Sequence, residues 1–138
     1  VRVRGVLDQS LERPVVVGLR GVDTPFCFVW DQDVVECLAA GVEDVAKVGI
    51  YNLTGDGVMT LREIAAGMGR RFVGLPKEWV ARALRVLSAR KLVPYGPEQV
   101  MFLEHRPVLC NDALKTGFGY RPQRTSREVF SLYRDSRA

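Results

Sequence analysis

Apolar residues recur along the first part of the chain with strand-like and then helix-like spacing. The β-branched run Val15–Leu19 predicts a strand, and residues 26–30 predict a second short one. Five apolar residues then share one helical face, at positions 34, 35, 38, 39 and 42. Asp33 and Glu36 have the spacing of a capping box, and Asp44 is expected to end this helix.

Residues 48–53 form a nearly continuous apolar run, which is typical of a strand buried on both faces in a parallel sheet. A glycine-rich turn follows at 54–57. Thr60 and Glu63 then form a capping box, which predicts a short helix ending near Met68. Residues 71–74 predict a fourth strand.

The last part of the chain is mainly helical in pattern. A helix is expected after Pro76, ended by Pro94 and Gly96. Residues 95–106 are ambiguous, Asn111 is expected to cap a short helix that Gly117 ends, and Thr125 with Glu128 opens a last helix. The apolar face of the helix after Pro76 comprises Trp79, Val80, Ala83, Leu84 and Leu87.

These elements predict a mixed α/β fold with short strands and four to five helices. The 138 residues form one domain, 1–138, with an average share of hydrophobic (47%) and charged (26%) residues. No apolar run has the length of a membrane span, and no signal segment opens the chain, so we expect a cytoplasmic protein without a membrane partner. Cys27, Cys37 and Cys110 are widely spaced, which argues against a zinc site or a disulfide framework.

Charge divides the chain into two unlike halves. Residues 1–69 carry 6 Lys/Arg and 10 Asp/Glu, whereas residues 70–138 carry 14 and 6. A basic half is compatible with a nucleic-acid or phosphate-bearing partner, and equally with ordinary solvated helix faces.

Catalytic motifs are scarce. His105 is the only histidine, and the sequence has no Walker loop, no G-x-G-x-x-G turn and no Tyr-x-x-x-Lys pair. Asp31 and Asp33 stand at a helix start, where capping and the helix dipole favour carboxylates. We therefore predict no catalytic residue and no metal ligand in this chain.

Three segments nonetheless resemble the C-terminal part of the extended short-chain dehydrogenases/reductases, the NAD-dependent epimerase/dehydratase family. The first, 25–35, matches a family strand and a helix opened by an aspartate, here Asp33. The second, 49–55 with the helix start at 60–65, matches a Val-Tyr-Asn-Leu-Gly strand and a capped helix. The third, 106–125, matches a short strand, a helix and a Leu-Gly-Trp/Tyr-x-Pro motif. Together they cover roughly residues 14–134.

The resemblance implies a substrate-binding lobe with an incomplete Rossmann sheet. In the family the N-terminal half binds NAD or NADP and carries the Tyr-x-x-x-Lys pair, and this chain has neither feature. The expected function is thus the substrate-binding region of an NAD(P)-dependent epimerase, dehydratase or reductase, with oxidoreductase or isomerase chemistry in the whole protein. The piece itself would be inactive and would not bind the cofactor tightly.

Four residues are candidates for substrate contacts: Arg106, Phe26, Trp30 and Trp79. Trp30 stands where histidine is common in the family, and Phe26 where nucleotide-sugar members often have arginine. Arg106-Pro107 matches the start of an Arg-Pro-Gly-Asp motif whose arginine contacts phosphate, although the glycine and aspartate are replaced. The implied substrate is a small molecule, with a nucleotide sugar as one option.

Two other functions stay open at this point: a non-catalytic binding or sensor module related to the family, and, with less support, a nucleic-acid-binding protein. The chain starts with valine, which fits either a piece of a longer protein or a GTG start codon. If residues 48–53 belong to a sheet whose other strands are missing, the piece should self-associate through exposed apolar surface.

Overall fold

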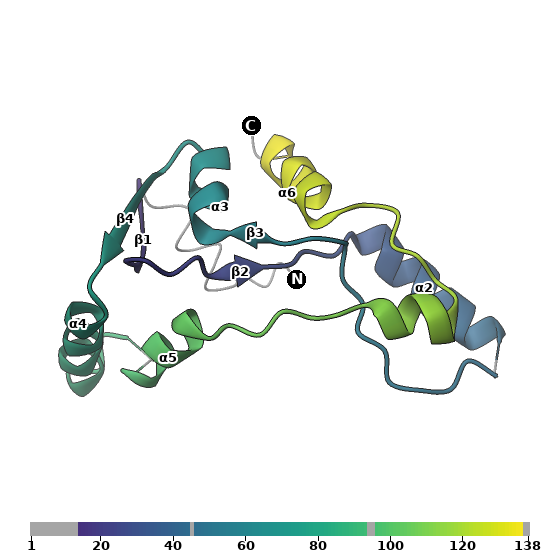
Figure 1. The fold of residues 1–138 in the computed structure, drawn as a ribbon, viewed down its shortest axis with the longest axis horizontal. Helices are drawn as coiled ribbons and strands as arrows, with labels where there is room; N and C mark the ends of the chain where they lie inside the picture. Colours follow the sequence, from purple (N-terminus) through teal and green to yellow (C-terminus); the bar gives the residue numbers. More distant parts are fainter. Residues whose placement is uncertain (1–13, 45, 94–95, 137–138) are drawn as a thin grey trace. The chain divides into compact units, whose positions relative to one another are not determined.

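A computed structural model describes residues 14–44, 46–93 and 96–136. The chain divides into two compact units, of which unit 1 comprises residues 1–25 and 60–107, and unit 2 comprises 26–59 and 108–138. The described residues form four strands, β1 to β4, and six helices, which are α2 to α6 and the π-helical turn η1. Figure 1 shows their arrangement along the chain. The mixed α/β class is confirmed, with one helix more than expected.

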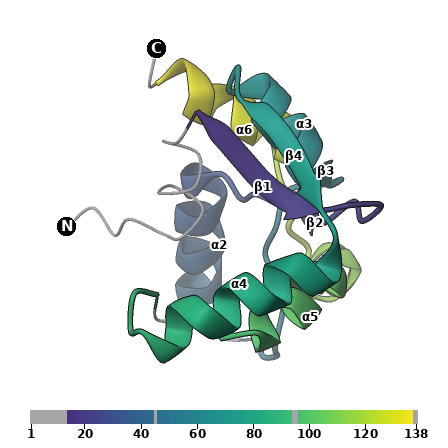
Figure 2. The same cartoon turned by 90° about the vertical axis from the view of Figure 1, so that its left-hand side faces the viewer.

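Unit 1 is built on a two-stranded parallel sheet. Strands β1 (Val15–Leu19) and β4 (Arg71–Leu75) pair in register, with Val16 opposite Phe72 and Gly18 opposite Gly74 (Figure 2). Helix α3 (Leu61–Gly67) contributes the fully buried Ile64, and its predicted Thr60–Glu63 capping box is present. Helices α4 (Lys77–Ala89) and α5 (Glu98–Glu104) pack against each other. Pro94, the predicted end signal of α4, lies outside the described residues.

Unit 2 packs two helical elements around a small apolar core. Helix α2 (Asp31–Glu43) and the π-helical turn η1 (Leu114–Phe118) bury Cys37, Leu114 and Phe118 together. The ring of Tyr51 meets that of Phe118 edge-on at 5.4 Å between centroids. Helix α6 (Ser126–Asp135) starts at the predicted capping box of Thr125 and Glu128.

Two predicted strands are wrong in whole or in part. The second strand is shorter than expected, because only Pro25–Phe26 (β2) pairs, with Met59–Thr60 (β3). Residues 48–53 form no strand, and Val48 and Ile50 are 82% and 99% exposed instead of buried. A strand needs a neighbouring backbone, and no described residue pairs with this segment, although Tyr51 and Leu53 still pack against the unit 2 core.

Two predicted caps are also wrong. Trp30 is the N-cap of α2. Asp33 lies in the first turn of the helix, fully buried, and its carboxylate accepts hydrogen bonds from Tyr120 and Gln123. The Asn111 side chain donates a hydrogen bond to the distant Thr54 carbonyl instead of capping a helix. The π-helical turn η1 ends at Gly119, not Gly117, and Gly119 has the left-handed conformation at φ 81°. In both cases a tertiary contact competes successfully with the local cap.

No helix in the described part of the chain combines the length and the apolar character needed to cross a bilayer.

Candidate functional site

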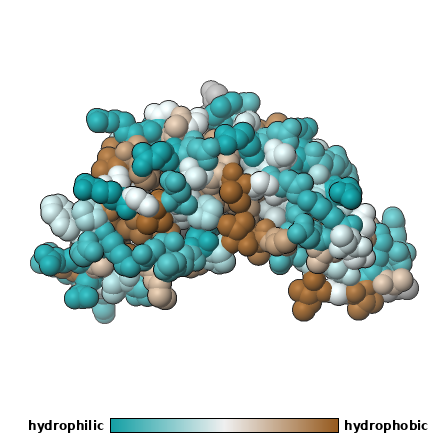
Figure 3. Space-filling model, viewed as in Figure 1, coloured by the Kyte–Doolittle hydropathy of each residue, from teal (hydrophilic) through white to brown (hydrophobic). Residues whose placement is uncertain are grey.

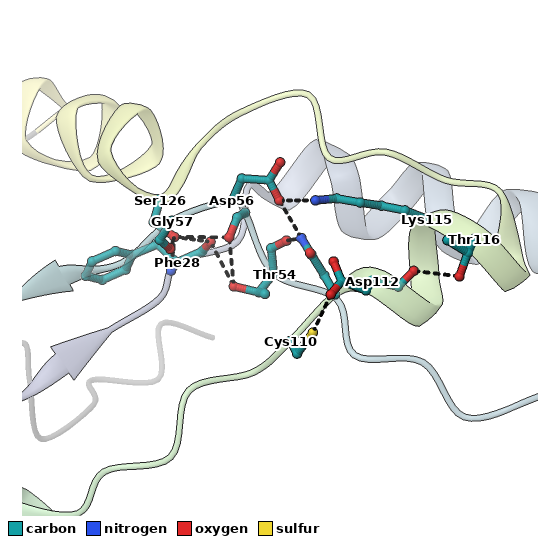
Figure 4. A network of polar contacts seen from close by, with 11 residues as sticks. Phe28, Thr54, Asp56, Gly57, Cys110, Asp112, Lys115, Thr116 and Ser126 are labelled. Atoms are coloured by element: carbon teal, nitrogen blue, oxygen red, sulfur yellow. Dashed lines mark hydrogen bonds and ion pairs between the residues drawn. The ribbon is translucent and has the colours of Figure 1, made fainter.

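Parts of the three segments that carry the family resemblance meet around Gly55 in unit 2, whereas residues 60–65 and Arg106 belong to unit 1. Figure 4 shows Phe28, Thr54 and Ser126 of this junction. The Gly55 N–H donates to the carbonyl oxygen of Phe28 at 2.8 Å. A Cβ atom on Gly55 would lie 2.7 Å from the Arg124 carbonyl oxygen and 2.8 Å from that of Phe28. Only glycine fits between these backbones.

Ser126 joins the same segments through its buried hydroxyl group. Its Oγ accepts from the Phe28 N–H at 3.1 Å and donates to the Gly57 carbonyl at 2.8 Å. The Ser126 N–H donates to the Asp56 carbonyl at 2.8 Å. Because Ser126 is the first residue of α6, these bonds fix the start of α6 to the loop after residue 53.

A second polar group fixes η1 to that loop. The Asn111 amide donates to the Thr54 carbonyl and to Asp56 Oδ1, both at 2.8 Å. The Lys115 ammonium donates to the same Asp56 oxygen at 2.6 Å. These donors, Lys115 first and Asn111 second, lower the pKa of the Asp56 carboxyl below its usual value.

The buried carboxylate of Asp33 connects α2 to the segment before α6. Its Oδ1 accepts from the Tyr120 hydroxyl at 2.8 Å and from the Gln123 N–H at 3.0 Å. Glu36 Oε2 lies 3.0 Å from the same phenol oxygen. Burial, followed by the hydrogen bonds to Asp33 and Glu36, raises the pKa of Tyr120 above its usual value.

Trp30 and Arg124 form an aromatic–cation pair at the start of α2. The Arg124 guanidinium carbon lies 4.6 Å from the centroid of the Trp30 ring. Its Nε is buried without a hydrogen-bond partner among the described residues. A guanidinium stacked on a ring keeps its in-plane N–H donors available for a carboxylate or phosphate, so the pair can hold an anionic group.

The four predicted substrate-contact residues are divided between the two units. Phe26 and Trp30 belong to unit 2, where Phe26 is buried in β2 and Trp30 is half-buried. Trp79 and Arg106 belong to unit 1. Trp79 is 67% exposed on α4, and the guanidinium carbon of the half-buried Arg106 lies 5.3 Å from the centroid of the Phe102 ring.

The described residues contain no group of three or more His, Cys, Asp or Glu side chains arranged to hold a metal ion. Cys27, Cys37 and Cys110 are free thiols, and burial, the largest cause, raises the pKa of Cys37.

Sequence reasoning missed several residues that the structure places at this junction. Arg124 and Gln123 were not singled out, because they follow the recognisable Tyr120-x-Pro122 motif without a pattern of their own. Lys115 belongs to the third resembling segment and Ser126 to the last predicted helix, but the pattern assigns neither side chain a role at the junction. A buried serine at the first position of a capped helix gives no sequence signal that separates it from an exposed one.

Comparisons with known proteins give distant relatives without a described function. No family model matches the chain. Uncharacterized proteins of Mycobacterium bovis and Mycobacterium tuberculosis are 26% identical to it over 129 residues. The match covers 92% of this chain and 34% of each relative, so the chain spans about a third of their length.

Proposed function

We propose that this chain is the substrate-binding C-terminal region of a longer NAD(P)-dependent epimerase, dehydratase or reductase of the extended short-chain dehydrogenase type. The proposal is supported by one observation above all. Segments 25–35, 49–55 with 60–65, and 106–125 resemble that family separately, and within unit 2 parts of all three are joined by hydrogen bonds around Gly55, Asn111 and Asp33. A chance resemblance of three separate segments would not require them to meet.

Uncovered apolar positions support a missing half. Parallel sheets are normally covered on both faces, yet Val15, Val17 and Val73 of the unit 1 sheet are exposed. In unit 2, Val48 and Ile50 are exposed beside packed neighbours, and α2 exposes Val35, Leu38 and Val42 at helical spacing. Apolar side chains also reach the surface in patches on the face drawn in Figure 3. We propose that an N-terminal Rossmann half covers these surfaces in the whole protein.

In the whole protein, this region would bind and orient the substrate and exclude water. Arg106 of unit 1 is one proposed contact for a phosphate-bearing small molecule such as a nucleotide sugar, and Arg124 stacked on Trp30 in unit 2 is a separate candidate contact. NAD or NADP would itself accept or return the hydride. This chain lacks the Gly-rich turn and the Tyr-x-x-x-Lys pair, so its own residues supply neither hydride nor proton transfer.

The proposal is tested by assaying the longer gene product with NAD or NADP and a set of nucleotide sugars, with the 138-residue chain as the inactive control. Arg106→Gln should raise KM by roughly tenfold or more, since a charge-assisted bond to phosphate is lost. Arg134→Gln is the matched control, because Arg134 pairs with its neighbour Asp135 on α6. A longer product that neither binds nor turns over NAD(P) contradicts the proposal and favours a binding module.

The 138-residue chain alone should self-associate. Sedimentation velocity over a range of concentrations should show species larger than a monomer. Val48→Lys combined with Ile50→Lys should shift the chain toward the monomer, whereas Leu132→Lys on α6 should not. A clean monomer at high concentration would contradict the uncovered-surface argument.

A further inference from the structure

Helix α4 has an unexpected division between its buried and exposed sides. Within the predicted apolar face, Val80 and Leu84 are half-buried, whereas Trp79 and Leu87 are exposed. Helix α4 packs against α5 (Figure 2), with Lys77 paired to Glu104, and Trp79, Val86 and Leu87 are left exposed.

The uncovered side of α4 forms a continuous apolar stripe. Trp79, Ala83, Val86 and Leu87 follow the i, i+4, i+7, i+8 spacing of one helical face and line a shallow hollow together with Arg82. Leu92, just after the helix, is also exposed. The stripe thus extends along the whole length of α4.

The polar side of α4 and the residues that follow it are rich in cationic side chains. Arg82 borders the stripe, Arg85 lies farther round on the polar side, and Arg90 and Lys91 follow the end of the helix. None of the acidic side chains in the described ranges forms an ion pair with these four residues. Glu78 is the single acidic residue of α4, and helical spacing places it between Arg82 and Arg85 on the polar side.

We propose that α4 lies on an anionic lipid surface, with its apolar stripe in the headgroup region and its arginines on the lipid phosphates. A helix with Trp, Val and Leu on one side and several Arg beside them has the composition of interfacial helices. Charge complementarity favours an anionic bilayer. This inference is independent of the proposed function. It replaces the expectation of no membrane partner, which was based on the lack of a spanning run and of a signal segment.

Co-sedimentation of the 138-residue chain with vesicles tests the proposal. The chain should bind vesicles that contain phosphatidylglycerol in phosphatidylcholine, and it should bind pure phosphatidylcholine much more weakly. Each basic residue at an anionic surface is worth about a fivefold change in partitioning. Arg82→Gln, Arg85→Gln and Arg90→Gln together should therefore weaken binding by roughly a hundredfold.

Controls separate α4 from the rest of the molecule. Trp79→Phe should keep the binding but remove the blue shift of tryptophan emission on vesicle addition, because Trp30 lies elsewhere in the fold. Arg121→Gln, Arg127→Gln and Arg134→Gln change the net charge equally and should leave binding nearly unchanged. The proposal would be overturned if both triple variants lost vesicle binding equally, or if the chain bound anionic and pure phosphatidylcholine vesicles equally well. Binding to polyglutamate but not to vesicles would also overturn it, since it would indicate an acidic protein partner.

Discussion

Replacing Gly55 by alanine tests the junction in unit 2 at its tightest point. The added Cβ would meet the Arg124 carbonyl oxygen at 2.7 Å, the Phe28 carbonyl oxygen at 2.8 Å and the Ser126 nitrogen at 3.0 Å. All three are backbone atoms, so no side chain can rotate to relieve the contact. At least one backbone segment must move.

The cost can be estimated from the contacts. Overpacking of this kind typically costs about 1–3 kcal/mol, and a rigid backbone neighbourhood places Gly55→Ala at the upper end. Loss of the hydrogen bond from the Gly55 N–H to Phe28 adds about 1 kcal/mol. We expect a total of about 3–4 kcal/mol, a large part of the stability of about 5–15 kcal/mol of an ordinary domain.

Urea unfolding followed by circular dichroism, at one low protein concentration, measures this change. Gly41→Ala is the matched control, because the new methyl group in α2 would lie 3.8 Å from the Phe118 ring, an ordinary contact. It should stabilise the chain by about 0.5–1 kcal/mol through better helix propensity. A Gly55→Ala variant that loses less than about 1 kcal/mol would refute the packing described at the junction.

Two further predictions concern buried polar groups of unit 2. Ser126→Ala should cost about 1–3 kcal/mol, because the Phe28 N–H would lose its partner, whereas Ser136→Ala at the exposed end of α6 should be nearly neutral. Equal effects of the two serine variants would argue against the buried bond. The pKa of the Tyr120 phenol is higher in the folded chain than in the unfolded chain. Above about pH 10 the unfolded state therefore loses this proton while the folded state keeps it. The free energy of unfolding should thus fall as the pH rises further. Tyr120→Phe should flatten this alkaline slope of the unfolding free energy, and an unchanged slope would contradict the assignment.

Local signals in the sequence predict several elements correctly. Thr60 and Thr125 each have a glutamate three residues later, and both helices start there with complete capping boxes. The β-branched run of β1 forms the expected strand, and α2 runs from Asp31 to Glu43 as its apolar spacing predicts. These features depend on residues close together in the chain, which is why pattern alone finds them.

Features that depend on distant partners were not predictable in this way. Residues 48–53 have a strand composition but find no described backbone to pair with. Asp33 has the spacing of a helix cap, but its carboxylate instead accepts a hydrogen bond from the Tyr120 hydroxyl, 87 positions later in the sequence. The contact of Arg124 with Trp30 likewise joins residues that no periodicity relates.

Reading the gene upstream of the Val1 codon tests the central claim most directly. The account predicts an in-frame segment that encodes a strand, a G-x-G-x-x-G turn and a helix, followed by a Tyr-x-x-x-Lys pair. A stop codon and a ribosome-binding site immediately before Val1 would contradict it. The 138 residues would then be the whole protein, and its function would have to be sought in binding by the chain itself.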